Sequence, residues 1–490
     1  MNFSIPDHKE IRKAFGEGEE AVVALFGDVT AQVEDLAAQL KKQAEALKDL
    51  QARLSKNSRN SGKPPSSDGY NKKNRTGSLR KSGRNPNGGQ PGHKGHSLKR
   101  SENPDHTETY KPDECTECRM SLEAVVAVRE EERQVYDIPA IRIEVTSHRA
   151  EIKICPGCGT ENRGEFPESV GRGVRYGTGV KTWAAYFGNQ HHIPLERTAQ
   201  VIEDLTGHSV SEASLLQASE ELSECIRPSV DATEELLMNA EMLNADETGV
   251  RVKGKLHWLH VASTDSLTHY SVHEKRGKEA TDAAGILGEF SGTAVHDHWK
   301  SYFGYENCRH ALCNAHHLRE LNFIEKQYGQ TWAGDMGDLL LEIKEEVEKL
   351  KPDRDAFRSE EIGNFARRYD EIVSRGFADN PFTPPKKKKK GRPKRTPPLN
   401  LLIRLRDYRA ETLAFMYDFR IPFDNNAAER DVRMMKVKQK VSGCFRTFEG
   451  AERFARIRGY ISTARKNSKN IFGAIRDAFC GDPFIPDAAV

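Results

Sequence analysis

The chain of 490 residues has no run of about 18 apolar residues, the length that a membrane-spanning helix needs. Its opening, MNFSIPDHKEIRK, has neither an apolar signal core nor a small-residue cleavage site. Cysteine is sparse, with nine in all, four of them in two CxxC pairs. In a chain without an export signal, such pairs favour metal ligation or free thiols over disulfides. We therefore expect a soluble, cytoplasmic protein with no membrane partner.

Acidic residues are almost missing from two segments, although the formal net charge is only +2. Between Arg53 and Arg100 the one acid is Asp68, and from Ser58 to Gly95 the chain is mostly Gly, Pro, Ser, Asn and base. Such a segment has too little to bury to fold alone. It is either a solvated linker or a basic arm that orders on a nucleic-acid backbone.

The second basic segment is PPKKKKKGRPKRTPP, residues 384–398. Its centre, which contains Arg392 and Lys394, is close to the R-G-R-P core of an AT-hook, and an extended Gly-Arg-Pro segment can lie in a narrow A·T minor groove. A solvated charge run or a generic phosphate contact is the alternative. The AT-hook interpretation would make double-stranded DNA the partner of this segment.

The N-terminal region has a heptad repeat of apolar residues in which Gln43 is the one polar position. The repeat comprises Phe26, Val29, Val33, Leu36, Leu40, Leu47, Leu50 and Leu54. It predicts a helix of about eight turns that pairs with a second copy as a coiled coil. An amphipathic helix packed on its own domain is the alternative.

Two CxxC knuckles follow the basic arm, with the ligand set Cys115, Cys118, Cys155 and Cys158. The segments RQVYDIP and RIEVTSHRAEIKI between them alternate like strands. Two knuckles joined by a β-hairpin predict a zinc ribbon with a closed, structural four-thiolate site, although the intervening loop is longer than the usual spacing of about 15 to 20 residues. Unmetallated or redox cysteines are the alternative.

Residues 166–236 read as helices. Within them, ERTAQVIEDLTGHSVSEASLLQASEEL has two amphipathic stretches joined by a turn that contains glycine, and Ser211 is suited to cap the second stretch. A helix-turn-helix that reads DNA has this pattern, and so has a helical hairpin that only packs.

After Leu243 the sequence changes to strands in the order β-β-β-α-β. The segments are LNADETGVRV, KLHWLHVAST, THYSVHEKR, KEATDAAGILGEF and GTAVHDHWKSY. This order opens a ribonuclease H-like fold, in which the first and fourth strands are neighbours. Asp246 on the first strand and Asp297 at the end of the fourth should then meet, and two adjacent carboxylates are stabilised by the hard cation Mg²⁺.

A third carboxylate for that site is offered by Glu429 in FDNNAAERDVRMMK, residues 423–436. The plain structural alternative is a capping box in which Asn426 caps a helix and Glu429 reaches back to it. Glu247 should point to the opposite face of its strand, and Asp431 should lie about 200° around the helix from Glu429. Two further acids near strand ends are minor alternatives, Asp265 and Glu274.

Long phrases of the sequence are similar to the transposase of the IS66 family of insertion sequences. They include NADETG, AVHDHWKSY, NNAAERDVRMMKVKQKVSGCFRTFEGAERFARIRGYISTARK, SKNSRNSGKPPSSDG and GGQPGHKGHSL. The similarity runs from about residue 30 to 475. HDHWK and HALCNAHHLREL resemble a branch thought to act from one reading frame, so two small accessory proteins are not expected to be required.

The resemblance implies a DDE transposase whose metal-binding catalytic triad is Asp246, Asp297 and Glu429. It implies Mg²⁺ or Mn²⁺ at the triad, structural Zn²⁺, and two-metal phosphoryl transfer that joins a freed 3′-OH of an element end to target DNA. A bacterial enzyme of this kind acts as a homodimer or larger complex and associates with the nucleoid when bound to DNA. The alternatives are a ribonuclease H-like nuclease that only cleaves and a non-catalytic, zinc-containing DNA-binding protein.

Near the second aspartate, Cys313-x2-His316 resembles an element of several DDE families that supports the active site or touches the DNA end. The alternatives are ordinary core packing and a second zinc site formed by Cys308, His310, Cys313 and His316. Bases that follow Glu429 suit phosphates near the scissile bond, or form ordinary helix-surface pairs. They are Arg430, Arg433, Lys436, Lys438 and Lys440.

Asp297 and Glu429 are separated by 132 positions, which implies a helical insertion in the core. We therefore expect a multidomain α+β protein with an N-terminal coiled-coil segment, a basic linker, a zinc ribbon, a helical domain that possesses the helix-turn-helix pattern, and a ribonuclease H-like α/β core in two parts that flank the insertion with its basic loop. The corresponding ranges are 1–57, 58–105, 106–165, 166–236, 237–329 with 401–490, and 330–400.

Overall fold

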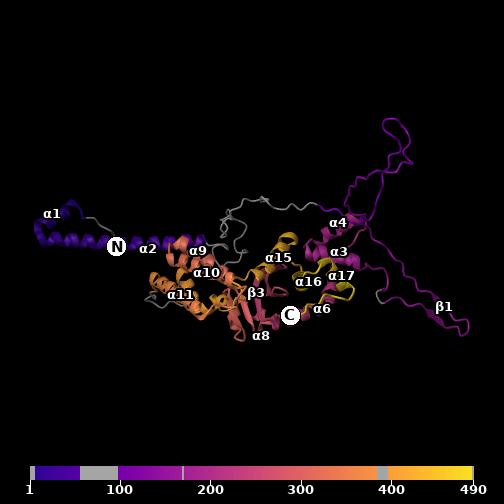
Figure 1. Cartoon of the computed structure of the whole chain (residues 1–490). Helices are drawn as coiled ribbons and strands as arrows, with labels where there is room; N and C mark the ends of the chain where they lie inside the picture. Colours follow the sequence, from indigo (N-terminus) through magenta and orange to yellow (C-terminus); the bar gives the residue numbers. More distant parts are fainter. Residues whose placement is uncertain (1–5, 56–97, 168–169, 383–394, 488–490) are drawn as a thin grey trace. The chain divides into compact units, whose positions relative to one another are not determined.

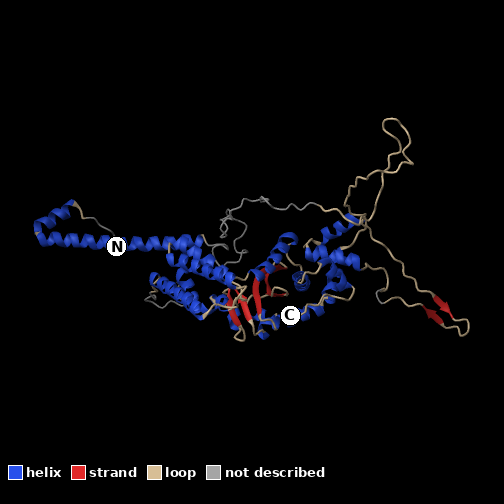
Figure 2. Cartoon of the chain, in the orientation of Figure 1, coloured by secondary structure: helices blue, strands red, loops and turns tan. Residues whose placement is uncertain are grey.

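The computed structural model describes residues 6–55, 98–167, 170–382 and 395–487 (Figures 1 and 2). The basic arm predicted at 58–95 and the basic loop with Arg392 and Lys394 lie outside the described residues. The chain divides into two compact units, one of residues 72–146 and one of residues 1–71 with 147–490. Among the described residues, no helix is long and apolar enough to cross a membrane.

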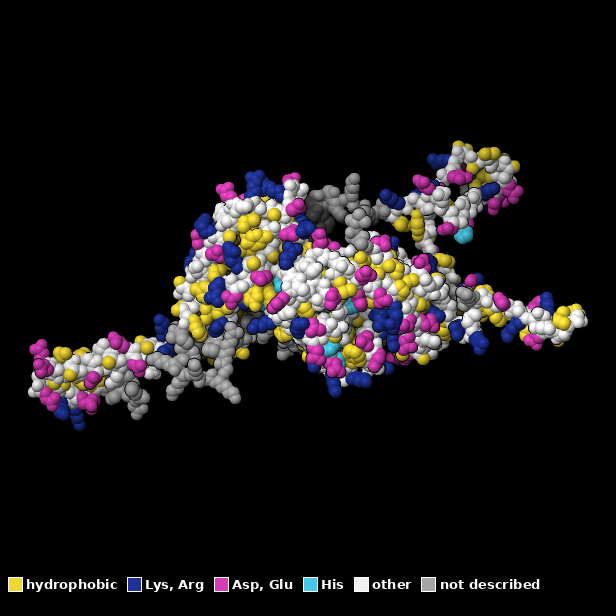
Figure 3. Space-filling view, turned by 90° about the horizontal axis from the view of Figure 1, so that it is seen from below, with side chains coloured by type: hydrophobic (Ala, Val, Ile, Leu, Met, Phe, Trp, Pro, Cys, Tyr) yellow, Lys and Arg dark blue, Asp and Glu magenta, His cyan; other side chains and the backbone are white. Residues whose placement is uncertain are grey.

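The predicted N-terminal helix is confirmed and begins earlier than the heptad. Helix α1 (His8–Glu17) starts at a capping box formed by Asp7 and Glu10, and α2 (Glu19–Leu54) contains the whole heptad. The heptad side chains are exposed apart from the half-buried Val29, for example Leu40 at 59% and Leu47 at 58%. Hydrophobic and acidic side chains thus lie together on the surface of the N-terminal helices α1 and α2 (Figure 3). Pairing of this face with a second copy stays a prediction.

Each CxxC pair forms a tight turn. In the 72–146 unit, the N–H of Arg119 donates to the carbonyl of Cys115 over 3.0 Å. In the other unit, the N–H of Gly159 donates to the carbonyl of Cys155 over 2.9 Å, between strands β1 (Ile152–Ile154) and β2 (Glu161–Arg163). The turns match the knuckles of a zinc ribbon, and the four-thiolate site itself stays a prediction.

The long strands predicted between the knuckles are wrong. RQVYDIP is irregular, and of RIEVTSHRAEIKI only β1 is a strand. The alternating apolar side chains are exposed, including Val135 at 90% and Val145 at 91%. Alternation predicts a strand only where another layer covers the apolar face, and no such layer lies over these side chains in the described part of the chain.

The helices predicted after residue 166 are present. They are α3 (Thr178–Ala185), the π-helix η2 (Tyr186–Gln190), α4 (Leu195–Thr206), α5 (Glu212–Cys225) and α6 (Arg227–Met238). Ser211 caps α5 as predicted, since its hydroxyl accepts the N–H of Ser214 over 3.1 Å. Helices α3, α4 and α5 share one apolar core, in which Ile202 and Leu215 are buried. Reading of DNA by this hairpin stays a prediction.

The predicted β-β-β-α-β order is confirmed. The strands are β3 (Met242–Val252), β4 (Lys255–Ser263), β5 (Thr268–His273), β6 (Thr293–His296) and β7 (Arg309–Leu312), and two short helices, α7 (Lys278–Ala283) and α8 (Ile286–Glu289), precede β6. The sheet order is β5-β4-β3-β6-β7, antiparallel from β3 to β5 and parallel from β3 to β7. A two-residue turn with positive φ at Lys253 and Gly254 joins β3 to β4, as in type I′ hairpins.

Helices cover both faces of this sheet (Figures 1 and 2). Val250 and Val261 pack with α15 (Asn426–Ser442) and α16 (Phe448–Lys466) on one face. Leu243 and Ala245 pack on the other face with α6, α8 and the 3₁₀-helix η3 (Tyr302–Gly304). Helix α17 (Ile471–Phe479) packs against α3, α5 and α16.

The helices that connect β7 to α15 share a core of their own and extend on both sides of the insertion predicted at 330–400. They are α9 (Asn314–Tyr328), α10 (Thr331–Leu350), α11 (Ser359–Asp379), α12 (Pro397–Asp407), α13 (Arg409–Thr412) and α14 (Ala414–Tyr417). Trp332 and Tyr369 are fully buried at the centre of this core. The connection fixes where Glu429 returns to the sheet.

Candidate active site

Asp246 lies within β3, and Asp297 directly follows β6, the parallel strand beside it. The last residue pair in the β3–β6 register is Asn244 with Val295, and each aspartate lies two residues beyond it. Neighbouring strands are about 4.8 Å apart, so the two carboxylates project from adjacent positions at one end of the sheet. The structure therefore brings together the two aspartates that the sequence predicts to meet.

The two aspartates repel each other in a poorly hydrated site. Burial, followed by the charge of Glu247, raises the pKa of Asp297 to about 7. Burial likewise raises the pKa of Asp246 well above its ordinary value, and the charges of Glu247 and Asp297 raise it further. Two backbone N–H groups orient the carboxylates, from Glu247 to Asp246 and from Trp299 to Asp297, each over 2.8 Å. Both groups thus favour the neutral form unless a positive charge joins them.

Glu429 approaches this pair from α15. Its charge raises the pKa of both aspartates, so it lies within electrostatic reach of them. Its Oε1 atom accepts a hydrogen bond from Arg319 Nη2 over 3.3 Å and lies 4.0 Å from His316 Nδ1. Arg433, one turn along the helix, is 3.5 Å from its other oxygen. The carboxylate is turned toward the side chains of α9.

The predicted capping box at this helix start is wrong. Helix α15 begins at Asn426, its N-cap is Asn425, and no side chain caps it. Glu429 is therefore the fourth helical residue, too far along to reach back to the cap. The side chain of the N-cap residue, Asn425, instead hydrogen-bonds to the neighbouring strand β3.

Asn425 is a residue that the sequence reasoning missed. It is 1% exposed, its amide donates to the carbonyl of Ala245 over 2.8 Å, and its oxygen accepts from Asn244 over 2.8 Å. Its backbone N–H also donates to the thiol of Cys313 over 3.2 Å. Asn425 thus ties the start of α15 to β3 and to the end of β7, and the Asn-Asn pair before the helix is the one signal in the sequence.

The other acids near the site have structural partners. Glu247 points to the opposite face from Asp246, as predicted, where Arg276 Nε donates to it over 2.8 Å and the hydroxyl of Tyr302 donates to it as well. Asp431 pairs with Lys466 Nζ at 3.0 Å. The two minor alternatives, Asp265 and Glu274, are exposed.

Arg276 is a second residue that the sequence reasoning missed. Its guanidinium lies 3.7 Å from the ring centroid of Trp299 and 4.8 Å from that of Trp258. Trp299 in turn donates its backbone N–H to Asp297. Arg276 therefore supports the loop that orients Asp297 while it pairs with Glu247.

Cys313 and His316 lie beside Glu429. One ligand-type atom of each of these three residues lies within 4.8 Å of the others. Burial raises the pKa of Cys313 to about 12, and burial followed by the charge of Arg319 lowers the pKa of His316 to about 4. The C-x2-H element therefore lies at the third acid, as the sequence resemblance implies for an active-site support.

The alternative zinc site with Cys308 and His310 is wrong. Both side chains contact the carbonyl of Tyr305, at 3.6 Å and 3.0 Å, and the other ring nitrogen of His310 lies 2.9 Å from His296. In the described part of the chain, neither joins the group of Cys313 and His316. The strand β7 places Cys308 and His310 near its start and Cys313 beyond its end.

Of the five basic residues proposed for DNA contacts on α15, three are exposed, namely Arg430, Arg433 and Lys440. The predicted DNA contact is wrong for the other two, Lys436 and Lys438. Lys438 is 8% exposed, donates to the carbonyl of Gly443 over 3.1 Å and lies 3.7 Å from the Phe445 ring. Lys436 donates to the carbonyl of Gly249 over 2.8 Å. These two ammonium groups stabilise the sheet–helix contact instead of facing a phosphate.

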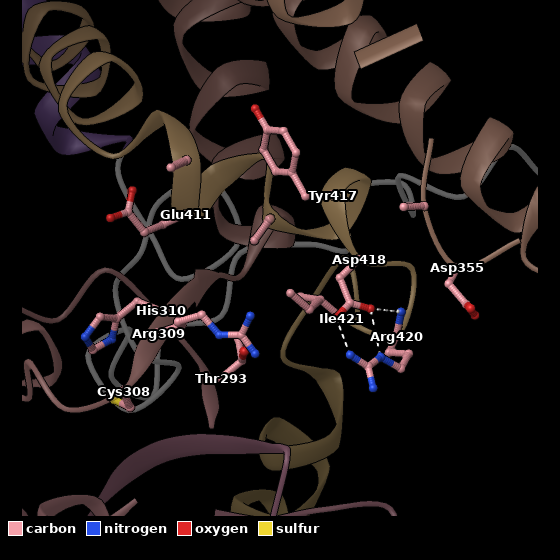
Figure 4. Close-up of a pocket in the computed structure, with 13 residues that line it drawn as sticks. Thr293, Cys308, Arg309, His310, Asp355, Glu411, Tyr417, Asp418, Arg420 and Ile421 are labelled. Atoms are coloured by element: carbon pink, nitrogen blue, oxygen red, sulfur yellow. Dashed lines mark hydrogen bonds and ion pairs between the residues drawn. The ribbon is translucent and has the colours of Figure 1, made fainter. Parts of the chain in front are cut away.

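A cavity of about 960 Å³ lies near the starts of β6 and β7 (Figure 4). Its lining includes Thr293 and Arg309 from those strands, and Asp418, which pairs with Arg420 at 2.8 Å. None of the three proposed catalytic acids lines it. Asp297 follows the opposite end of β6, with Asp246 beside it on β3, so this cavity and the acid pair are separate features.

Asp246 thus lies within β3, Asp297 directly follows the parallel strand β6, and Glu429 comes from α15, which returns to the same sheet. Residues 173–453 match the model of the transposase IS66 family, and the chain belongs to that family. The resemblance seen in the sequence is thereby confirmed. Residues 4–99 match a second family, whose function is unknown.

A solved structure gives a much weaker similarity. It is the cryo-EM structure of the simian T-cell lymphotropic virus intasome in complex with PP2A regulatory subunit B56 gamma. The match is 11% identical, covers 43% of this chain and 78% of that chain, and has a TM-score of 0.14, too low to establish a common fold. No curated protein matches the chain.

Proposed function

We propose that this chain is a DDE-type DNA transposase, with Asp246, Asp297 and Glu429 as its acids on a ribonuclease H-like core. The observation that carries the proposal is the pair of aspartates, Asp246 within β3 and Asp297 directly after the neighbouring strand β6, with Glu429 within electrostatic reach. Membership of the IS66 transposase family supports it. Its substrate is double-stranded DNA, at the ends of an insertion sequence and at the target.

The donor set of the acid pair fits Mg²⁺ or Mn²⁺. Burial and neighbouring carboxylates raise the pKa of both aspartates, and the charge of Asp297 is one of the causes for Asp246. A hard divalent cation with oxygen ligands relieves the cost of ionising them together. Asp246 and Asp297 would hold the ion, and Glu429 would complete the set after leaving Arg319 and His316. When bound, the metal would activate water as a nucleophile and stabilise the leaving 3′ oxygen.

The residues of the chain position these groups. The N–H groups of Glu247 and Trp299 fix the two aspartates, and Arg276 pairs with the Glu247 side chain on the opposite face of β3. The exposed Arg430 and Arg433 lie on the helix of Glu429 and suit the phosphates that flank a scissile bond. No side chain needs to attack DNA covalently, because water and then a 3′-OH serve as nucleophiles.

The other modules would bind DNA or assemble the complex. The four CxxC thiols would hold one structural Zn²⁺. The exposed heptad of α2 would join two copies, and the α4–α5 hairpin and the basic segments would contact the element ends.

The test is cleavage of duplex DNA that carries the inverted repeats flanking the gene, with Mg²⁺ or Mn²⁺ and with EDTA. We expect metal-dependent nicks at the 3′ ends of the repeats and products joined to a target duplex. Nicks without joined products would indicate a ribonuclease H-like nuclease instead. Binding with neither product would indicate a DNA-binding protein whose acids only shape the fold.

A further inference from the structure

Three side chains of different chemistry meet beside the acid pair. Cys313 precedes α9, His316 lies in its first turn, and Glu429 comes from α15. A sulfur, a nitrogen and an oxygen from these residues all lie within 4.8 Å of one another. Within the described ranges, this is the one group of three or more Cys, His, Asp or Glu side chains close enough to bind a single ion.

The backbone holds the cluster together. The N–H of His316 donates to the carbonyl of Cys313 over 3.1 Å, which places both side chains on one turn. The N–H of Asn425 donates to the Cys313 sulfur over 3.2 Å and so fixes the start of α15 against this turn. Glu429 is four residues further along α15, one turn closer to His316.

One atom of the cluster lacks a partner. His316 Nδ1 is buried without a hydrogen bond, and it faces Glu429 Oε1 at 4.0 Å. Buried polar atoms are nearly always satisfied, so an unpaired ring nitrogen beside a thiol and a carboxylate points to a ligand. A cation bound between these residues would accept the lone pair of that nitrogen.

The donor set selects the kind of cation. Sulfur, imidazole nitrogen and carboxylate oxygen together suit Zn²⁺ and similar borderline-soft ions, whereas Mg²⁺ prefers oxygen alone. Three protein ligands leave the fourth tetrahedral position open for water. The thiol proton would pass to solvent on binding.

We propose that Cys313, His316 and Glu429 bind one Zn²⁺-class cation, and that this binding keeps Glu429 away from Asp246 and Asp297. Arg319 holds the Glu429 carboxylate on this side by a hydrogen bond of 3.3 Å. The site is therefore a switch on the third acid: Zn²⁺ there opposes the Mg²⁺-dependent reaction. The inhibitory part rests on the proposed transposase function, while the binding part stands without it.

The binding test counts metal in the full-length chain. Wild type and variants are saturated with Zn²⁺, freed of excess ion, and measured by elemental analysis. Cys313→Ser and His316→Gln should each hold one equivalent less than wild type, whatever the CxxC thiols hold. With Co²⁺ in place of Zn²⁺, Cys313→Ser should lose one equivalent of thiolate-to-metal absorption. Because Cys313 is buried, the less buried His316 provides the variant that tolerates substitution better.

Cys308→Ser and His310→Ala are matched controls, since both residues lie outside the cluster. They should keep the wild-type metal count. Equal counts in wild type, Cys313→Ser and His316→Gln would overturn the proposal, and so would an equal loss in the Cys308 control.

The inhibitory part is tested in the Mg²⁺ cleavage assay with added Zn²⁺. We expect His316→Gln to need at least ten times more Zn²⁺ than wild type for half-inhibition. The same sensitivity in both proteins would overturn the switch. If wild type cleaves nothing in Mg²⁺, the transposase proposal fails, and the metal count still decides whether the cluster is a site.

Discussion

At the scale of residues, the candidate active site brings together carboxyl groups that repel one another when they are ionised. Asp297 keeps its proton up to a pH of about 7 because its pKa is raised, mainly by burial. The unfolded chain loses that proton near pH 4. Between these values the folded state binds more protons, so the ionised site costs stability progressively as the pH rises from 4 to 7.

Asp297→Asn should therefore stabilise the metal-free protein at pH 8 by roughly 2–4 kcal/mol, since it removes this cost. The gain should disappear near pH 4, and urea unfolding at the two pH values measures it. Mg²⁺ should stabilise wild type more at pH 8 than at pH 6, because protons compete with the metal. A variant that is less stable than wild type at pH 8 would contradict the carboxylate repulsion.

Asn425 and Asn426 test how the third acid is positioned. Asn425→Ala removes two buried side-chain hydrogen bonds to β3 and leaves buried partners unsatisfied. We expect it to destabilise the protein by about 2–4 kcal/mol. The adjacent Asn426 is exposed and caps nothing, so Asn426→Ala should change the unfolding free energy by less than about 0.5 kcal/mol. Similar losses in both variants would favour a capping role for Asn426.

At the scale of elements, α15 presents two kinds of basic side chain. Arg430 and Arg433 are exposed, whereas Lys438 is bound to the carbonyl of Gly443. In the sequence these basic residues form one run with regular spacing and cannot be told apart. Only the packing of α15 on the sheet shows which of them are exposed. Fewer basic residues of α15 are therefore available for DNA contacts than the sequence suggests.

Arg430→Ala with Arg433→Ala should weaken DNA binding and reduce the slope of log K against log salt by about two. Lys438→Met should leave that slope unchanged, because its ammonium group faces the protein. Titrations of labelled duplex at several salt concentrations give both slopes. A reduced slope for Lys438→Met would place this lysine at the phosphates after all.

Helix α2 has an exposed apolar face along its heptad. Leu40 and Leu47 are more than half exposed in its heptad. Leu40→Glu with Leu47→Glu should convert a dimer into a monomer, because charged side chains at seam positions oppose pairing. Lys42→Glu, on an exposed position outside the seam, is the control and should keep the dimer mass. Unchanged mass in the Leu variant, measured by light scattering, would exclude α2 as the main contact between copies.

At the scale of the whole molecule, the sheet was predictable because strand order and register follow from local pattern. Asp246 and Asp297 could be paired from the β-β-β-α-β order alone, and Glu247 could be set aside by its period of two. Whether the segments between the CxxC pairs form strands could not be decided from the sequence. The alternation of apolar residues near Val135 does not show whether another layer covers these side chains. Asn425, Arg276 and the turn of Glu429 toward Cys313 depend on contacts between segments far apart in sequence, which no local pattern contains.

The most direct test of the central claim is nick mapping with Glu429→Gln. Purified wild type and variant are incubated with duplexes that carry the flanking inverted repeats, in Mg²⁺ and in EDTA. We predict cuts at the 3′ ends of the repeats in wild type with Mg²⁺, a loss of at least a thousandfold in the variant, and nearly equal DNA binding by both. A variant that cuts as wild type does would show that Glu429 is not a catalytic acid.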